Sequence, residues 1–163
     1  MNNYLRRVYA FNLAYCETLL KDIPEAEMRA QPSPGINPPA WLLGHLAICT
    51  DFTLELMGGM KQLPAEWHRE FGPQSQPLSK EFPYPTKEEL WDAYSAGHAA
   101  VTALSTEVPV DLLEHPNPLP FEFLKVLLPT TGDLIAHLMS THEASHLGHL
   151  SNWRRQMGHP PLF

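Results

Sequence analysis

Apolar side chains recur at helical spacing near the start of the chain. Within residues 2–21, Leu5, Tyr9, Leu13 and Cys16 follow one another at intervals of three or four residues, and the segment has no glycine or proline. Residues at these intervals share one face of an α-helix. The pattern therefore predicts a first helix over residues 2–21.

Capping signals bound three further helices. Asparagine before proline, and threonine with an acidic residue three positions later, are typical of helix N-termini, whereas glycine often follows a C-terminus. These signals predict a helix from an Asn37 cap with Pro38 as its first residue to Gly58-Gly59, one from a Thr86 cap with Glu89 through Glu107, and one from a Thr130 cap with Asp133 to Met157, before Gly158.

Two proline-rich stretches separate these helices. Residues 60–85 carry five prolines and no sustained period, and residues 108–120 are similar. Four helices without a convincing strand indicate an all-α fold, a four-helix bundle with two long Pro-rich connections, formed as a single domain by residues 1–163. The first connection is expected to cover the open end of the bundle and to contribute Trp67, Phe71 or Phe82 to a pocket.

The composition argues against nucleic acids and membranes as partners of the protein. Lys and Arg total 11 against 18 Asp and Glu, so the net charge of −7 disfavours a nucleic acid. No apolar run approaches the length of a membrane span, and the first residues do not resemble a signal peptide. The expectation is a cytoplasmic protein without a membrane partner, whose two cysteines, Cys16 and Cys49, form no disulfide framework and are buried thiols.

Histidines are concentrated near the C-terminus, where His142-Glu143-Ala144-Ser145-His146 matches the H-E-x-x-H pattern of zinc proteases. Two histidines four apart on a helix can chelate one metal ion. A protease also needs a third ligand downstream, but no Asp or Glu follows His146, and Gly148 stands one position too early for the extended motif. Proteolysis is therefore not the preferred interpretation.

A different helix can supply the missing ligand. His45 follows Trp41 by four residues within an apolar stripe of the second helix, and core-facing side chains of a bundle converge. Two alternatives stay open from spacing alone: His149 can replace His146, and Cys49 can act as a fourth ligand. Ordinary hydrogen-bonded core histidines are the competing explanation.

The sequence resembles the DinB/YfiT-like family of metal-binding bundles. The resemblance rests on "NPPAWLLGHLA", "YPTKEEL" and "HEASHLGHLSNWRRQMGHP" and extends over nearly the whole chain. The metal ligands of that family, one histidine in the second helix and an H-x-x-x-H pair in the fourth, match His45, His142 and His146. The resemblance implies a divalent metal ion, zinc or nickel first, with iron or manganese as alternatives, and a homodimer.

Three neutral histidines leave an open coordination position, which suits a reactive site. The expected activity is that of a metal-dependent transferase using a low-molecular-weight thiol, or of a hydrolase, on a small-molecule substrate. The alternative is a non-catalytic metal-binding or structural module. Glu143 is the candidate general base, with a solvated surface charge as its plainer interpretation. Arg154 and Arg155 suit either an anionic substrate or the negative end of the helix dipole.

Overall fold

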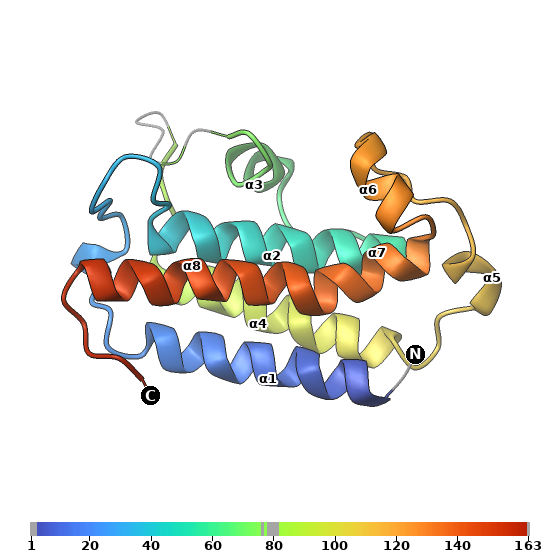
Figure 1. Ribbon diagram of the computed structural model, residues 1–163, viewed down its shortest axis with the longest axis horizontal. Helices are drawn as coiled ribbons and strands as arrows, with labels where there is room; N and C mark the ends of the chain where they lie inside the picture. The colour runs from blue at the N-terminus through green and yellow to red at the C-terminus, as the bar shows by residue number, and fades with distance from the viewer. Residues whose placement is uncertain (1–2, 76, 78–81, 163) are drawn as a thin grey trace.

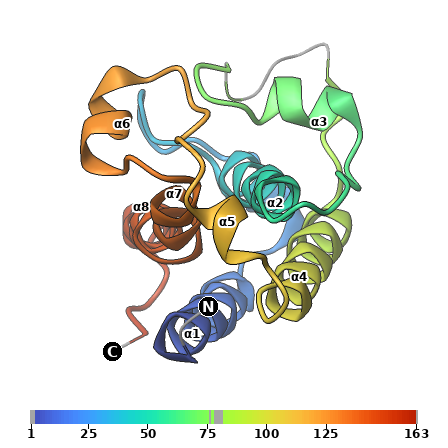
Figure 2. The same ribbon diagram turned by 90° about the vertical axis from the view of Figure 1, so that its right-hand side faces the viewer.

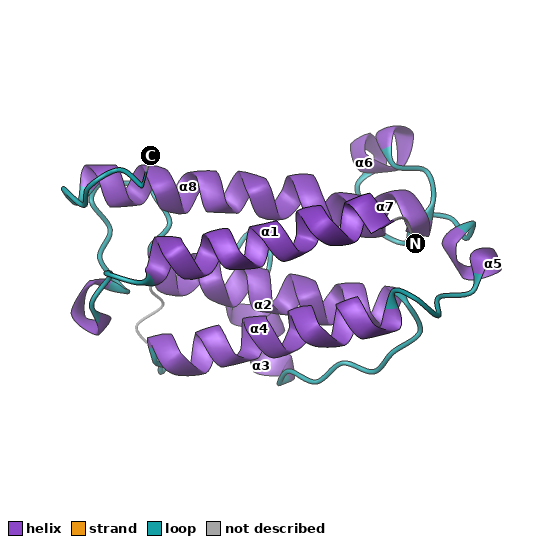
Figure 3. Cartoon of the chain, turned by 90° about the horizontal axis from the view of Figure 1, so that it is seen from below, coloured by secondary structure: helices purple, strands orange, loops and turns teal. Residues whose placement is uncertain are grey.

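The computed structural model describes residues 3–75, 77 and 82–162, and the part of the chain that it describes is helical (Figure 3). Within these residues no strand is present, and β-type pairing is confined to an isolated bridge between Pro116 and Thr130. The prediction of an all-α fold is therefore confirmed. None of the described helices combines the length and apolarity that crossing a membrane requires.

The long helical segments lie side by side along the molecule (Figures 1 and 2). They are α1 (Asn3–Leu20), α2 (Pro39–Leu56), α4 (Lys87–Leu104) and a last run made of α7 (Thr131–His137), the π-helical turn η2 (Leu138–His142) and α8 (Glu143–Gln156). Each falls within a segment whose periodicity predicts a helix.

Short helices lie between the long ones, and two of them fall within the connections that were predicted to be irregular, residues 60–85 and 108–120. They are η1 (Glu25–Glu27), α3 (Ala65–Glu70), α5 (Val110–Leu113) and α6 (Glu122–Leu127). One or two turns are too short to show a 3.6-residue period, so the sequence pattern missed them. Helices α3 and α6 lie on the same side of the molecule, α3 above α2 and α6 above α7 (Figure 2).

Both predicted threonine caps are present as reciprocal capping boxes. The Thr86 side chain accepts from the Glu89 backbone N–H and the Glu89 carboxylate accepts from the Thr86 backbone, and Thr130 and Asp133 form the same pair. The predicted cap of the second helix is wrong by one residue. Pro38 takes the cap position and Pro39 is the first helical residue, since both prolines have a φ suited to a helix start.

Helix α2 is the central element, with most of its side chains buried. Its packing against α4 depends on Gly97, because a Cβ there would lie 2.1 Å from Thr50 Oγ1. A helix enclosed in this way has little freedom to rotate. It therefore holds His45 at a fixed position inside the molecule.

Arg154 has a structural role that the sequence did not predict. Its side chain is buried, donates to the Leu19 carbonyl at 2.7 Å and pairs with the Asp22 carboxylate. The hydrogen bond and charge of Arg154 lower the pKa of Asp22 to about 2. The guanidinium ties α8 to the end of α1, so it is not available to a substrate.

Candidate functional site

Three histidines from two distant parts of the chain meet between the helices, His45 buried and the other two half-buried. His45 lies on α2, His142 ends the π-helical turn and His146 lies one turn further, on α8. His142 Nε2 is 3.4 Å from His45 Nε2 and 3.2 Å from His146 Nε2. One ligand atom from each residue lies within 4.8 Å of the others. The structure thus brings together the three residues that the sequence selected.

The orientation of His45 is fixed by its surroundings. Its Nδ1–H donates to the Phe71 carbonyl at 2.7 Å, and its ring stacks on Trp41 with a centroid separation of 4.9 Å. A neutral imidazole carries one proton, so this bond leaves a lone pair on Nε2. The lone pair is on the nitrogen nearest to His142. The Phe71 carbonyl, a backbone group in an irregular segment, could not be identified from the sequence.

Hydrogen bonds cannot account for both short contacts between the ring nitrogens of the triad. A ring nitrogen is a donor or an acceptor, but not both. If His142 Nε2 carries a proton, it can donate that proton to His45 or to His146, but not to both. If it carries none, its lone pair faces the lone pair of His45 Nε2. A cation placed among three lone pairs satisfies every contact at once.

The distances fit a metal ion. Two imidazole nitrogens bound to one zinc ion at about 2.0–2.1 Å with tetrahedral angles lie about 3.3 Å apart. The two observed separations are 3.2 and 3.4 Å. Nδ1 of His142 and of His146 are buried without a hydrogen-bond partner, so no neighbouring group forces the proton onto Nε2. The donor set can therefore present three neutral nitrogens to one ion.

Burial keeps these imidazoles uncharged. It lowers the pKa of His142 to about 3 and that of His146 to about 2, with the neighbouring histidines adding to the shift. Burial also lowers the pKa of His45, against the effect of its bond to Phe71. Metal ions bind neutral imidazole, so the site is in its binding form at neutral pH.

Phe71 reaches its position because residue 44 is a glycine. A Cβ at Gly44 would lie 2.5 Å from two carbons of the Phe71 ring. The ring therefore packs directly on the backbone of α2, beside His45. The same close approach brings the Phe71 carbonyl within reach of the imidazole.

We expect Gly44→Ala to lower both the stability of the protein and its affinity for zinc, although Gly44 is not a metal ligand. The added methyl group should lower the free energy of unfolding by about 1–3 kcal/mol through overpacking, and displacement of Phe71 should lower zinc affinity by about 10–100-fold. Chemical denaturation and competitive zinc titration measure the two effects. Gly148→Ala is the control, because nothing lies within 4 Å of a Cβ there. Unchanged zinc affinity in Gly44→Ala would mean that Phe71 does not hold His45.

Glu143 is neither a general base at the triad nor a solvated surface charge, the two environments that the sequence suggested. Its carboxylate is buried and accepts from Asn12 Nδ2 at 3.1 Å, Tyr94 Oη at 3.0 Å and His98 Nε2 at 2.7 Å. It is not a solvated charge, and its bonds join α8 to α1 and α4. The predicted general-base role does not fit this position, because the oxygens already serve three donors outside the triad.

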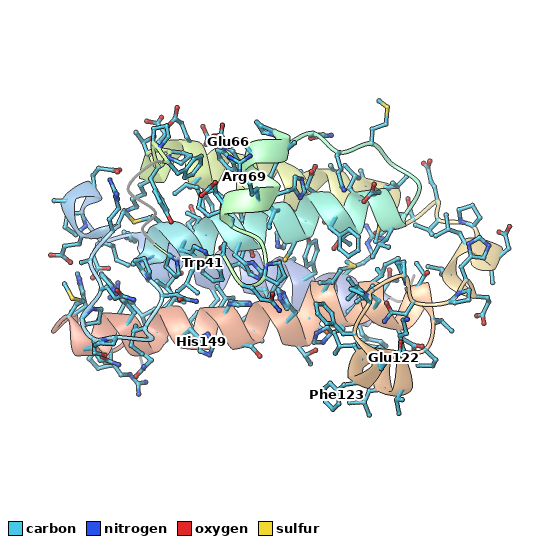
Figure 4. All side chains as sticks on the ribbon, turned by 90° about the horizontal axis from the view of Figure 1, so that it is seen from above. Trp41, Glu66, Arg69, Glu122, Phe123 and His149 are labelled. Carbon is cyan, nitrogen blue, oxygen red and sulfur yellow. The ribbon has the colours of Figure 1, made fainter. Side chains whose placement is uncertain are left out.

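Cys49 and His149, the two alternative ligands, lie outside the group of ligand atoms that meet within 4.8 Å among the described residues. Cys49 Sγ is 3.6 Å from His45 Nε2, and burial together with Glu143 raises the pKa of the thiol to about 12. His149 is exposed on α8 (Figure 4), with its ring centroid 5.6 Å from that of His146.

The connection after α2, residues 60–85, lines the cavity beside the triad with other residues than the aromatic ones that were expected. Trp67, Phe71 and Phe82 pack in or against the hydrophobic core. The group from this connection that lines the cavity beside the triad is His68, together with Pro73. Asp51, a buried residue of α2, bonds His68 at 2.7 Å. Sequence periodicity gave no signal for this pair, since α3 is only six residues long.

Comparison with protein families identifies a match that covers most of the chain. The family model described as the DinB superfamily matches residues 9–150, a range that includes all three histidines. A comparison with curated proteins gives no match.

Proposed function

The chain belongs to the DinB superfamily, and on that premise we propose that it is a metal-dependent enzyme that acts on a small molecule. In this proposal α1, α2, α4 and the α7–α8 run are the four helices of the family's bundle, and residues 1–163 form one domain. His45, His142 and His146 bind one divalent ion, with zinc or nickel as the first candidates and iron or manganese as alternatives.

The convergence of three Nε2 atoms beside a cavity carries this proposal. His45 and His142 line that cavity, whose volume is about 300 Å³, at the lower end of the range for small-molecule sites. A metal ion with three protein ligands keeps a position for a further ligand. A structural site, which needs no access, would not require a cavity next to its ligands.

The residues of the chain have separable roles in such an enzyme. The three histidines hold the ion, and Phe71 fixes the direction of His45 through its carbonyl. The ion would supply acidification of a coordinated thiol or water. The cavity wall is mostly apolar, so a bound substrate would exclude water from it, which strengthens electrostatic interactions within. These features suit transfer of a low-molecular-weight thiol or hydrolysis.

A turnover screen tests the enzyme proposal. Protein loaded with zinc or nickel should catalyse either thiol addition to small electrophiles or hydrolysis of small esters and amides, and His146→Ala should abolish the activity. Gly148→Ala is the folded control from the same helix. Metal binding without turnover in either class, together with unfolding on chelation, would instead favour the alternative, a non-catalytic metal-binding or structural module. A homodimer remains a prediction, to be measured by light scattering.

A further inference from the structure

The cavity beside the triad is bounded by several elements. Helices α2 and α7 with the η2 turn supply one side, and α3 and α6 approach from above (Figures 2 and 4). In Figure 4, Glu66 and Arg69 lie on the outside of α3 and Phe123 on the outside of α6. The side chains that line the cavity are apolar apart from Cys49 and four histidines, and no Lys, Arg, Asp or Glu of the described residues lines it.

One of these histidines is held by a carboxylate. His68 Nε2 lies 2.7 Å from Asp51 Oδ2, and the His68 side chain is 24% exposed whereas that of Asp51 is 3% exposed. Asp51 is held in turn by the backbone N–H of Gln62 at 2.6 Å and that of Leu63 at 3.4 Å. The carboxylate is therefore fixed on α2 before it meets the imidazole.

This pairing fixes the orientation and the tautomer of the His68 imidazole. Because the carboxylate is the acceptor, Nε2 carries a proton, and in the neutral imidazole Nδ1 keeps the lone pair. A carboxylate in this position orients an imidazole and stabilises the imidazolium that forms when Nδ1 takes up a proton. His68 and two triad histidines line one cavity. A histidine that can accept a proton and the candidate metal site therefore line the same cavity.

We propose that His68, positioned by Asp51, transfers a proton to and from a largely apolar substrate bound in this cavity beside the triad. The proposal rests on the proposed function of the triad as a metal site. The S–H or O–H bond of a bound thiol or water breaks as an N–H bond forms at Nδ1, and the electron pair stays on sulfur or oxygen. The same proton is later returned to the product.

The substrate class follows from the cavity wall. Away from the ion, which would itself attract an anionic group, the described lining residues offer no cationic side chain, whereas an aryl or alkyl group would bury apolar surface against leucine, isoleucine and phenylalanine side chains. Phenylmethanethiol is a suitable probe, because it combines an apolar ring with an ionisable thiol. 2-Mercaptoethanol is the matched polar thiol.

The test uses full-length protein with cobalt(II) in place of the native ion. Mixing with phenylmethanethiol in a stopped-flow instrument follows the absorption band of a thiolate bound to cobalt. In His68→Gln the rate should fall about a hundredfold, because the amide can still bond Asp51 but cannot accept the thiol proton. The cobalt affinity and the final amplitude should stay unchanged, which a merely structural role of His68 would not predict.

His159→Gln is the matched control. His159 pairs with the Glu27 carboxylate at 2.8 Å, a similar imidazole–carboxylate contact that does not line the cavity, so its rate should equal that of the wild type. Phenylmethanethiol should also bind at least about tenfold more tightly than 2-mercaptoethanol, as expected for burial of an aromatic ring.

The outcomes separate the two proposals. Failure of the wild type to bind cobalt would overturn the proposed function itself. Cobalt binding with equal rates in wild type and His68→Gln would overturn only the role of His68. Cobalt binding without the thiolate band, or with equal affinity for the two thiols, would overturn the assignment of the cavity to an apolar substrate.

Discussion

His142→Ala should lower the affinity for zinc by more than about a hundredfold. His142 Nε2 is the atom that contacts both other triad nitrogens, at 3.4 and 3.2 Å. Its removal takes away a direct ligand, and loss of even an outer hydrogen-bond partner typically costs 10–100-fold. Competition with a chromophoric chelator measures the affinity, and the far-ultraviolet circular dichroism of the metal-free variant checks that it remains helical.

His149→Ala is the control for that experiment. It removes an imidazole from the same helix, and that ring is exposed and outside the triad, so zinc affinity should not change. If His149→Ala lost zinc and His142→Ala kept it, the assignment of the ligands along α8 would be wrong.

Glu143→Ala should lower the free energy of unfolding by about 3–5 kcal/mol. The substitution removes the shared acceptor of Asn12, Tyr94 and His98, all of them buried. Buried donors without an acceptor lose their hydration and gain nothing in return. Chemical denaturation of metal-free protein measures the effect. Glu17→Ala, an exposed glutamate on α1, should change stability by less than about 0.5 kcal/mol.

Glu143→Gln separates this structural role from catalysis. The isosteric amide keeps one acceptor oxygen, so the variant should fold, bind zinc and retain activity to within about tenfold. A stable, zinc-loaded Glu143→Gln protein whose activity fell a hundredfold or more would restore the general-base assignment. Wild-type stability in Glu143→Ala would contradict the described hydrogen-bond network.

The helices could be predicted because their signals are local. The capping boxes at Thr86 and Thr130 need only residues three apart, and the apolar period of residues 3–20 is repeated over several turns. The short helix α3 has no such repetition. The π-helical turn before Glu143 was also missed, because a single wide turn leaves the residue pattern nearly unchanged.

The metal-ligand candidates could be found in the sequence for a chemical reason, although only the family resemblance ranked His146 above His149. Imidazole is unusual on an apolar stripe, and His142 and His146 have the spacing of one helical turn. Their surroundings were not accessible, because they depend on contacts between distant segments. The Phe71 carbonyl reaches His45 only through the close packing at Gly44, and Asp51 meets His68 across a connection without regular period.

The most direct test of the metal site is X-ray absorption at the zinc K-edge on untagged protein loaded with one equivalent of zinc. The geometry of His45, His142 and His146 predicts three imidazole nitrogens at about 2.0–2.1 Å and a further light atom. A sulfur atom at about 2.3 Å would instead make Cys49 a ligand. A spectrum with fewer than three imidazoles would contradict the triad as the metal site.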